Sequence, residues 1–156
     1  MSKIMPCLWF DGRIEEAANF YTSVFPDAKI TNLAHYDDAG PMPKGTLLTV
    51  TFEIAGQEFM ILNGGAYFKI NEGVSFYVHC KDQAEVDHYW GKLSAVPQAE
   101  QCGWLKDKFG VSWQIVPDAL VRYVGDKDPV KANRVMQAML QMKKIVIADL
   151  DKAYAG

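Results

Sequence analysis

Three side chains that can take part in acid–base chemistry or hydrogen bonding alternate along one short segment. Ser75, Tyr77 and His79 stand at positions i, i+2 and i+4 of the β-rich run 73–80. Alternate residues of a strand project from one face, so these side chains would lie side by side. They would supply a hydroxyl, a phenol and an imidazole that can act as a general base. The alternative is a hydrogen-bonded interior wall without a chemical role.

A cysteine and two tryptophans make the segment 101–117 a second candidate. A reactive thiol needs a basic neighbour, and Lys106 lies near Cys102 in the sequence. Such a cysteine is more often a small buried residue, and we favour that interpretation. Trp113 is expected in the core, whereas Trp104 could belong to the core or line the mouth of a cavity.

The segment 101–117 has the pattern of a β-hairpin with its turn at 107–110. Gly110 offers the positive φ that hairpin turns need. Pro117 cannot donate a hydrogen bond to a neighbouring strand, so the second strand should stop there.

The hydrophobic pattern elsewhere predicts short strands that alternate with amphipathic helices. Strands are expected over 4–10, 29–36, 46–54, 57–62 and 73–80, and helices over 13–25 and 82–93. Asp82 with Glu85 resembles a helix-capping box. A further helix should begin at Asp128–Pro129 and carry an apolar stripe, and a last short helix should run over 147–154.

An internal repeat organises these elements. Residues 16–21 align with 85–90, and 56–62 align with 110–116. The repeat implies an α+β fold of two paired βαβββ modules, over about 3–64 and 73–117, with a helical extension over 118–156. We expect one domain over 1–156, whose sheets pair around a pseudo-twofold axis and form a cup.

Strand alternation assigns side chains to this cup. Extending the offset between the helices back to the first strand pairs Leu8 with Tyr77 and Phe10 with His79. The expected ligand-binding residues are Phe10, Met60, Ser75, Tyr77, His79, Trp104 and Gln114. Cys7 and Trp9 are expected on the opposite, helix-facing side.

Composition excludes several functional classes. The chain has 156 residues, of which 49% are hydrophobic and 22% charged, with a net charge of -3, so we expect no nucleic-acid partner. No apolar run reaches the length of about 20 residues that spans a membrane, and the N-terminal segment lacks the pattern of a signal peptide. Cys7, Cys80 and Cys102 form neither a disulfide framework nor a zinc motif, so we expect a cytoplasmic protein.

Several short motifs together resemble one known family. They are Leu8-Trp9-Phe10-Asp11-Gly12, Gly56-Gln57-Glu58-Phe59, Asn63-Gly64-Gly65, Cys102-Gly103-Trp104-Leu105-Lys106-Asp107 and Gly110-Val111-Ser112-Trp113-Gln114. The chain is similar to the PhnB-like family, labelled 3-demethylubiquinone-9 3-methyltransferase, of the glyoxalase/bleomycin-resistance (vicinal oxygen chelate) superfamily. This resemblance covers nearly the whole chain and implies paired βαβββ modules.

The resemblance also implies where a metal would be held in metal-dependent relatives, near Pro6, Met60, Ser75 and Gln114. Divalent metals prefer imidazole, thiolate or carboxylate ligands, and these residues offer none of them. We therefore expect no metal. The sequence also lacks the Gly-x-Gly-x-x-Gly run of a cofactor-binding turn, so we expect no cofactor and treat the methyltransferase label as a name only.

Two functions remain open. The first is metal-free binding of a small molecule in the cup. The second is an enzyme that acts on a small aromatic or quinone-like molecule, with His79 or Cys102 as its acid–base group or nucleophile. Methionine-rich C-terminal helices with an apolar face need a docking partner, which predicts a homodimer.

Overall fold

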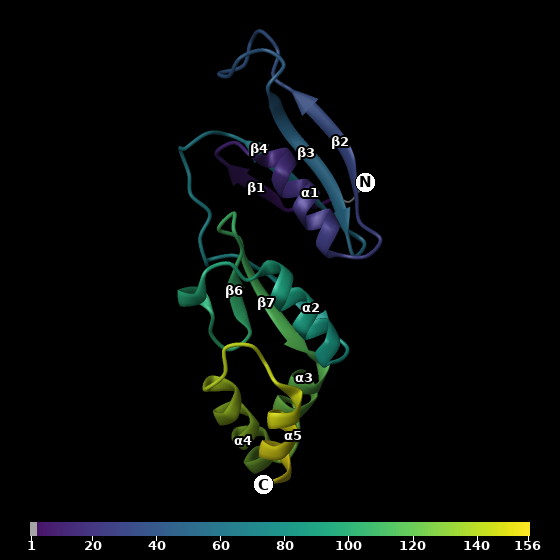
Figure 1. Ribbon diagram of the computed structural model, residues 1–156, viewed down its shortest axis with the longest axis vertical. Coiled ribbons are helices and arrows are strands. Elements are labelled where there is room, and N and C mark those ends of the chain that lie inside the picture. The colour runs from purple at the N-terminus through teal and green to yellow at the C-terminus, as the bar shows by residue number, and fades with distance from the viewer. Residues whose placement is uncertain (1–2) are drawn as a thin grey trace. The chain divides into compact units, whose positions relative to one another are not determined.

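The computed structural model describes residues 3–156. The chain divides into two compact units, Met1–Ile70 and Asn71–Gly156. Each unit packs a helix against a small β-sheet (Figure 1). The expected α+β class is confirmed, whereas the single-domain arrangement and the cup between modules stay predictions. No helix among the described residues has both the length and the apolarity needed to cross a membrane.

The first unit is the predicted βαβββ module. Its elements are β1 (Cys7–Phe10), α1 (Ile14–Val24), β2 (Lys29–His35), β3 (Leu47–Ile54) and β4 (Gln57–Asn63). The sheet has the order β1-β4-β3-β2. Strand β1 runs parallel to β4, and the other neighbours are antiparallel.

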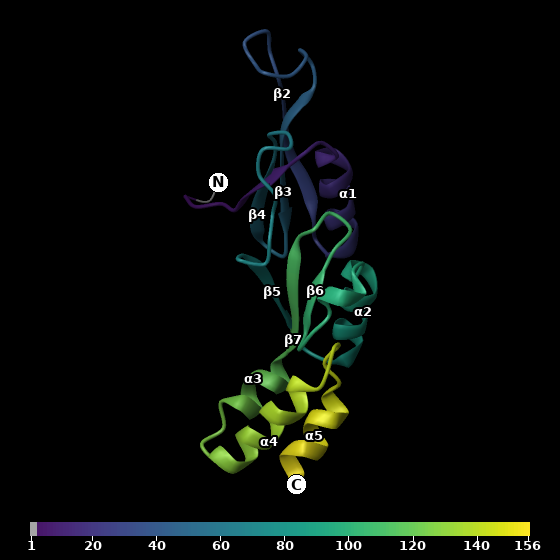
Figure 2. The ribbon, with the colours of Figure 1, turned by 90° about the vertical axis from the view of Figure 1, so that its left-hand side faces the viewer.

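Helix α1 covers one face of this sheet, as Figure 2 shows. The helix buries Ala17 and Tyr21, and the sheet buries Phe52 and Ile61. The rings of Tyr21 and Phe52 stack with their centroids 5.8 Å apart. Apolar residues at helical spacing in α1 and at alternate positions in the strands thus meet in one core, as the sequence pattern predicted.

The predicted face of β1 is wrong. Leu8 pairs with Ile61 in the sheet, and Phe10 pairs with Asn63. Residues directly opposite one another on neighbouring strands share a face, so Leu8 and Phe10 lie on the α1 side. Both are buried, with 7% of their surface exposed, while Cys7 is exposed. Phe10 is therefore a core residue and does not line an open cup.

The error comes from a difference of one residue between the two modules. Three residues, 11–13, separate β1 from α1, but two, 81–82, separate the equivalent strand and helix of the second unit. The correspondence inferred from the helices therefore does not extend to the strands, where Cys7, not Leu8, is equivalent to Tyr77. A shift of one residue moves every strand side chain to the opposite face.

Trp9 also lies on the face away from α1, contrary to expectation. Its indole nitrogen donates a hydrogen bond of 2.8 Å to the carbonyl oxygen of Gly65. Its ring lies against Gly64, where an added Cβ would come within 2.3 Å of the indole. The ring of Phe68 meets it edge-on, with the centroids 4.9 Å apart. Gly64 is thus needed for close packing.

The second unit differs from the first by one strand. Its elements are β5 (Ser75–Cys80), α2 (Gln83–Leu93), a 3₁₀ helix (Pro97–Ala99), β6 (Trp104–Lys106), β7 (Ser112–Pro117), α3 (Asp118–Val124), α4 (Pro129–Leu140) and α5 (Ile147–Ala155). The sheet has the order β5-β7-β6. The 3₁₀ helix stands where the first unit has its extra strand. Helix α3 lies within the helical extension predicted over 118–156, but no separate helix was predicted at its residues.

The start of α2 confirms Asp82 as the predicted N-cap, and Glu85 reaches back as in a capping box but to the residue before the N-cap. The Asp82 carboxylate accepts a hydrogen bond of 2.9 Å from the backbone N–H of Glu85. The Glu85 carboxylate in turn accepts one of 2.8 Å from the backbone N–H of Lys81. The first contact satisfies an amide that the first turn of a helix leaves without a partner, and the second ties Glu85 to the residue before the N-cap.

Asp107 fixes the turn of the predicted hairpin. The residue is buried, with 1% of its surface exposed. Its carboxylate accepts hydrogen bonds from the backbone N–H groups of Phe109 and Val111, at 2.8 and 3.0 Å. It also accepts one of 2.9 Å from the indole N–H of Trp113, which is a core residue as predicted.

Helices α3, α4 and α5 pack together at the C-terminal end of the second unit (Figure 1). Their core consists of Val116, Leu120, Val135, Ile145 and Leu150, with Met139 and Met142 packed against it. The backbone N–H groups of Cys102 and Gly103 donate to the carbonyls of Met142 and Lys143, at 2.9 and 2.8 Å. Part of the methionine stripe is thus covered within the chain. The covered part needs no docking partner, and the homodimer stays a prediction.

The corrected face of β1 predicts unequal effects of two substitutions. Phe10→Ala should lower the free energy of unfolding by about 3–5 kcal/mol, because it removes a ring from the core under α1. Cys7→Ala, three residues away on the exposed face, should change it by about 0.5 kcal/mol or less. Urea unfolding followed by circular dichroism measures both. A larger loss of unfolding free energy in Cys7→Ala than in Phe10→Ala would contradict the assignment of Phe10 to the core under α1.

Candidate functional site

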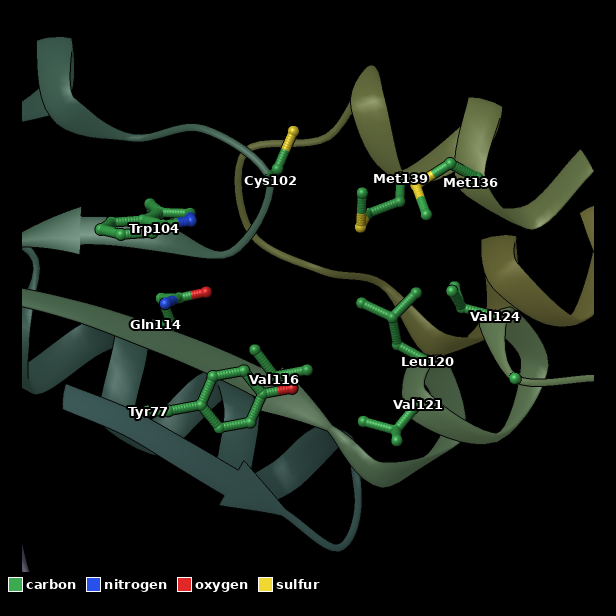
Figure 3. Close-up of a pocket in the computed structure, with 11 residues that line it drawn as sticks. Tyr77, Cys102, Trp104, Gln114, Val116, Leu120, Val121, Val124, Met136 and Met139 are labelled. Carbon is green, nitrogen blue, oxygen red and sulfur yellow. The ribbon is translucent and has the colours of Figure 1, made fainter. Parts of the chain in front are cut away.

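An open cavity of about 470 Å³ lies in the second unit, beside the face of the sheet opposite α2 (Figure 3). This volume falls within the usual range of small-molecule sites. Its walls come from the sheet, from the turn before β6 and from α3 and α4. The lining residues are Tyr77, Cys102, Trp104, Gln114, Val116, Leu120, Val121, Val124, Gly125, Met136 and Met139.

The sheet contributes a row of three large side chains. Gln114 in β7 is directly opposite Tyr77 in β5 on one side and Trp104 in β6 on the other. Cross-strand neighbours share a face, so an indole, an amide and a phenol stand in line. The Gln114 amide nitrogen donates a hydrogen bond of 3.0 Å to the Ser75 hydroxyl, which holds the amide in place.

The helices contribute an apolar wall. Leu120 and Val124 come from α3, and Met136 and Met139 come from α4. Figure 3 shows these side chains on the side of the cavity away from Trp104. Methionine side chains adapt to irregular shapes and make favourable contacts with aromatic rings. The wall therefore suits a flat apolar group.

Tyr77 keeps its phenol proton at neutral pH. Partial burial raises the pKa of the Tyr77 hydroxyl above its ordinary value, and the negative charge of Asp118 raises it further. Both causes disfavour the phenolate. Tyr77 can therefore both donate and accept a hydrogen bond at the edge of the cavity.

The structure brings together some of the predicted site residues. Tyr77, Trp104 and Gln114 line one cavity, and Ser75 supports Gln114 from outside it. Phe10 and Met60 belong to the first unit and are not among the lining residues.

His79 lies outside the cavity. Its side chain is 69% exposed, and its Nδ1 is 3.4 Å from a carboxylate oxygen of Asp118. The rings of His79 and Tyr77 lie with their centroids 4.9 Å apart. His79 is thus next to a lining residue, and a carboxylate can orient its imidazole.

Cys102 lines the cavity, but the expected basic neighbour is engaged elsewhere. The Lys106 ammonium forms an ion pair with Glu72. The Cys102 sulfur accepts a hydrogen bond of 3.2 Å from the side-chain amide of Gln101. Its backbone has a positive φ of 50° and serves to attach the C-terminal helices. These contacts favour a structural role for Cys102.

The residues of the helical wall were not predicted as site residues. The sequence did show an apolar stripe that includes Met136 and Met139. This pattern indicates a face that must be covered, but it does not say whether core, partner or ligand covers it. Helix α3, which carries Leu120 and Val124, falls in the predicted helical extension, but its start, its end and its apolar face were not predicted.

Ser75 and Gln114, two of the positions at which the superfamily resemblance would place a metal, do not fit a divalent cation. A hydroxyl from Ser75 and an amide from Gln114 are weak ligands, and they are hydrogen-bonded to each other. No group of three or more His, Cys, Asp or Glu residues that could hold a metal occurs within residues 3–156.

The chain thus consists of a βαβββ module, a second and related module with one strand fewer, and three C-terminal helices. The family model described as 3-demethylubiquinone-9 3-methyltransferase matches residues 2–116. The chain belongs to this PhnB-like family. The matched segment ends before α3, so the helical wall of the cavity lies beyond it.

Solved structures agree with this assignment. The chain is 38% identical to the PhnB protein from Bacillus cereus, with a TM-score of 0.63, and the match covers 74% of this chain and 99% of that one. Protein PA1353 from Pseudomonas aeruginosa is 21% identical with a TM-score of 0.57, over 75% of this chain and 98% of that one, and it supports the fold alone. No curated protein matches the sequence significantly.

The donor set predicts that divalent metals bind weakly. Titration of the purified protein with Zn²⁺, Ni²⁺ or Mn²⁺ in a calorimeter should show no one-to-one binding with a dissociation constant below about 10 µM. The small heats measured on adding each metal ion should be the same for Gln114→Ala as for the unmodified protein. One-to-one binding in the nanomolar range that Gln114→Ala abolishes would place a metal at this site.

Proposed function

We propose that the chain binds a small, flat, largely apolar molecule in the cavity of its second unit. The observation that supports this is the row of Tyr77, Gln114 and Trp104 opposite an apolar helical wall. Small-molecule sites are commonly lined by aromatic and aliphatic side chains with a few fixed polar groups. Here Gln114 is such a group, because Ser75 holds its amide.

Each wall has a distinct part in the proposed binding. Trp104 and Tyr77 offer aromatic surface at the sheet, and aromatic contacts stabilise beyond the area they bury. Met136 and Met139 offer polarisable groups from α4. A flat ring between these surfaces would lose water from both faces, which provides most of the binding free energy.

The family description names a methyltransferase, and the residues of this chain do not fit the cofactor of that activity. Cofactor cradles at strand-to-helix turns are rich in glycine so that the backbone can approach the ligand. The two such turns of the modules, 11–13 and 81–82, contain one glycine between them. We therefore assign no methyl-transfer step to this chain.

Trp104 provides the test of binding. We expect 1-naphthol, a neutral flat probe, to bind one-to-one with a dissociation constant of about 0.1 mM, as a ligand of this size allows. Trp104→Ala should weaken binding about tenfold or more, because an aromatic surface is lost. Calorimetry measures both values.

Trp90→Ala is the matched control. Trp90 is a half-buried residue of α2 and is not among the lining residues, so its removal should leave the affinity within about twofold. Equal losses in both variants, or no binding of 1-naphthol at all, would contradict the proposed site.

A second candidate is an enzyme with His79 as its acid–base group. The contact between His79 and Asp118 beside Tyr77 favours it, because a carboxylate that orients an imidazole is a common catalytic arrangement. The exposure of His79 favours simple binding. The two candidates share the cavity and differ in whether a bound molecule reacts.

His79→Ala separates the two candidates. In an enzyme, this variant should lower kcat for a substrate by about 10²–10⁴-fold, the usual contribution of a general base. The affinity for 1-naphthol should stay within about twofold, since His79 does not line the cavity. A turnover that is unchanged in the variant would remove His79 from the chemistry.

A further inference from the structure

Two polar atoms of the cavity have opposite hydrogen-bonding character and belong to paired residues of neighbouring strands. Trp104 and Gln114 are paired residues of β6 and β7. Figure 3 shows the indole nitrogen of Trp104 and the amide oxygen of Gln114 both on the cavity side of their side chains. The indole N–H only donates, and the amide oxygen only accepts.

Neither atom is used by the protein itself within the part of the chain that the structure describes. The hydrogen bond of Gln114 to Ser75 uses the amide nitrogen, at 3.0 Å, and leaves the amide oxygen. The indole N–H of Trp104 has no partner among residues 3–156, although the residue is half-buried. A ligand that enters the cavity must match both atoms, since unmatched polar groups weaken binding when water is excluded.

We infer that the cavity selects a neutral aromatic hydroxyl compound, that is, a phenol or hydroquinone. A hydroxyl group can donate to the Gln114 oxygen and accept from the Trp104 N–H at the same time. A quinone carbonyl or an aryl ether can only accept, and it would bring a lone pair against the Gln114 oxygen. This inference rests on the proposed function and names the ligand class of the same site.

The absence of charge in the lining favours the neutral form of the ligand. None of the eleven described residues that line the cavity is Lys, Arg, His, Asp or Glu. A carboxylate or a phenolate would lose hydration there without a counter-charge, which is costly. Aliphatic amines, which are cations at neutral pH, would meet the same obstacle. A phenol, which is uncharged at neutral pH, avoids both costs.

The test compares 1-naphthol with 1-methoxynaphthalene, which keeps the ring system and the oxygen but cannot donate. Calorimetry with the full chain should show that 1-naphthol binds about tenfold more tightly than 1-methoxynaphthalene. The naphthol forms a hydrogen bond to the Gln114 oxygen, whereas the ether leaves this acceptor without a partner. Gln114→Met keeps a similar volume and removes the acceptor, so it should reduce this preference to within about twofold.

Gln141→Met is the matched control, because Gln141 is an exposed residue at the end of α4 outside the cavity. It should keep the full preference. The circular dichroism spectrum and melting temperature of both variants verify that they fold.

The outcomes separate the two proposals. Equal binding of the two probes to the unmodified protein, or tighter binding of the ether, would overturn the inference while the proposed function stands. A preference that survives Gln114→Met would also overturn it. If neither probe binds, the proposed function fails and the inference fails with it.

Discussion

The second unit depends on the buried carboxylate of Asp107. A charge removed from water must be compensated by hydrogen bonds, and here two backbone amides and the indole of Trp113 supply them. This network closes the turn between β6 and β7 and so sets their register. The register in turn places Trp104 directly opposite Gln114 on the cavity side, while Trp113 enters the core under α2. Core and cavity wall are therefore two faces of one hairpin, and a shift of one residue would exchange them.

Local patterns predicted much of this fold because the interactions behind them are local. The N-cap of α2 and the alternation of β5 and β7 depend on residues a few positions apart, and these predictions agree with the structure. The face of β1 depended instead on a comparison between modules. One extra residue between β1 and α1 does not disturb the helix, but it inverts the strand relative to the repeat. A repeat inferred from helices thus does not by itself orient strands, and Phe10 was placed on the wrong face for this reason.

The sequence predicted the residues on only one side of the cavity. Its sheet side follows from strand alternation, which brought together Tyr77, Trp104 and Gln114. Its helical side depends on how α3 and α4 pack on the sheet, a long-range property that an apolar stripe does not specify. Lys106 was expected to be the basic neighbour of the Cys102 thiol because it is near in sequence. In the structure its ammonium group forms an ion pair with Glu72 instead. The family comparison does not replace this information, because the matched segment ends at residue 116, before the helices that complete the cavity.

The contact between Ser75 and Gln114 links the fold to its chemistry. These residues stand where the superfamily resemblance would place metal ligands, but a hydroxyl and an amide satisfy each other there. Because a hydroxyl and an amide are weak ligands for a metal, we expect selectivity in this cavity to come from shape, aromatic contact and a few hydrogen bonds. Each such contact changes the binding free energy of a ligand by a small amount. One unmatched donor or acceptor can therefore decide which of two similar ligands binds more tightly. The polar atoms that the protein leaves unused in its own cavity are thus better guides to its ligand than the fold, which is shared by proteins of different activities.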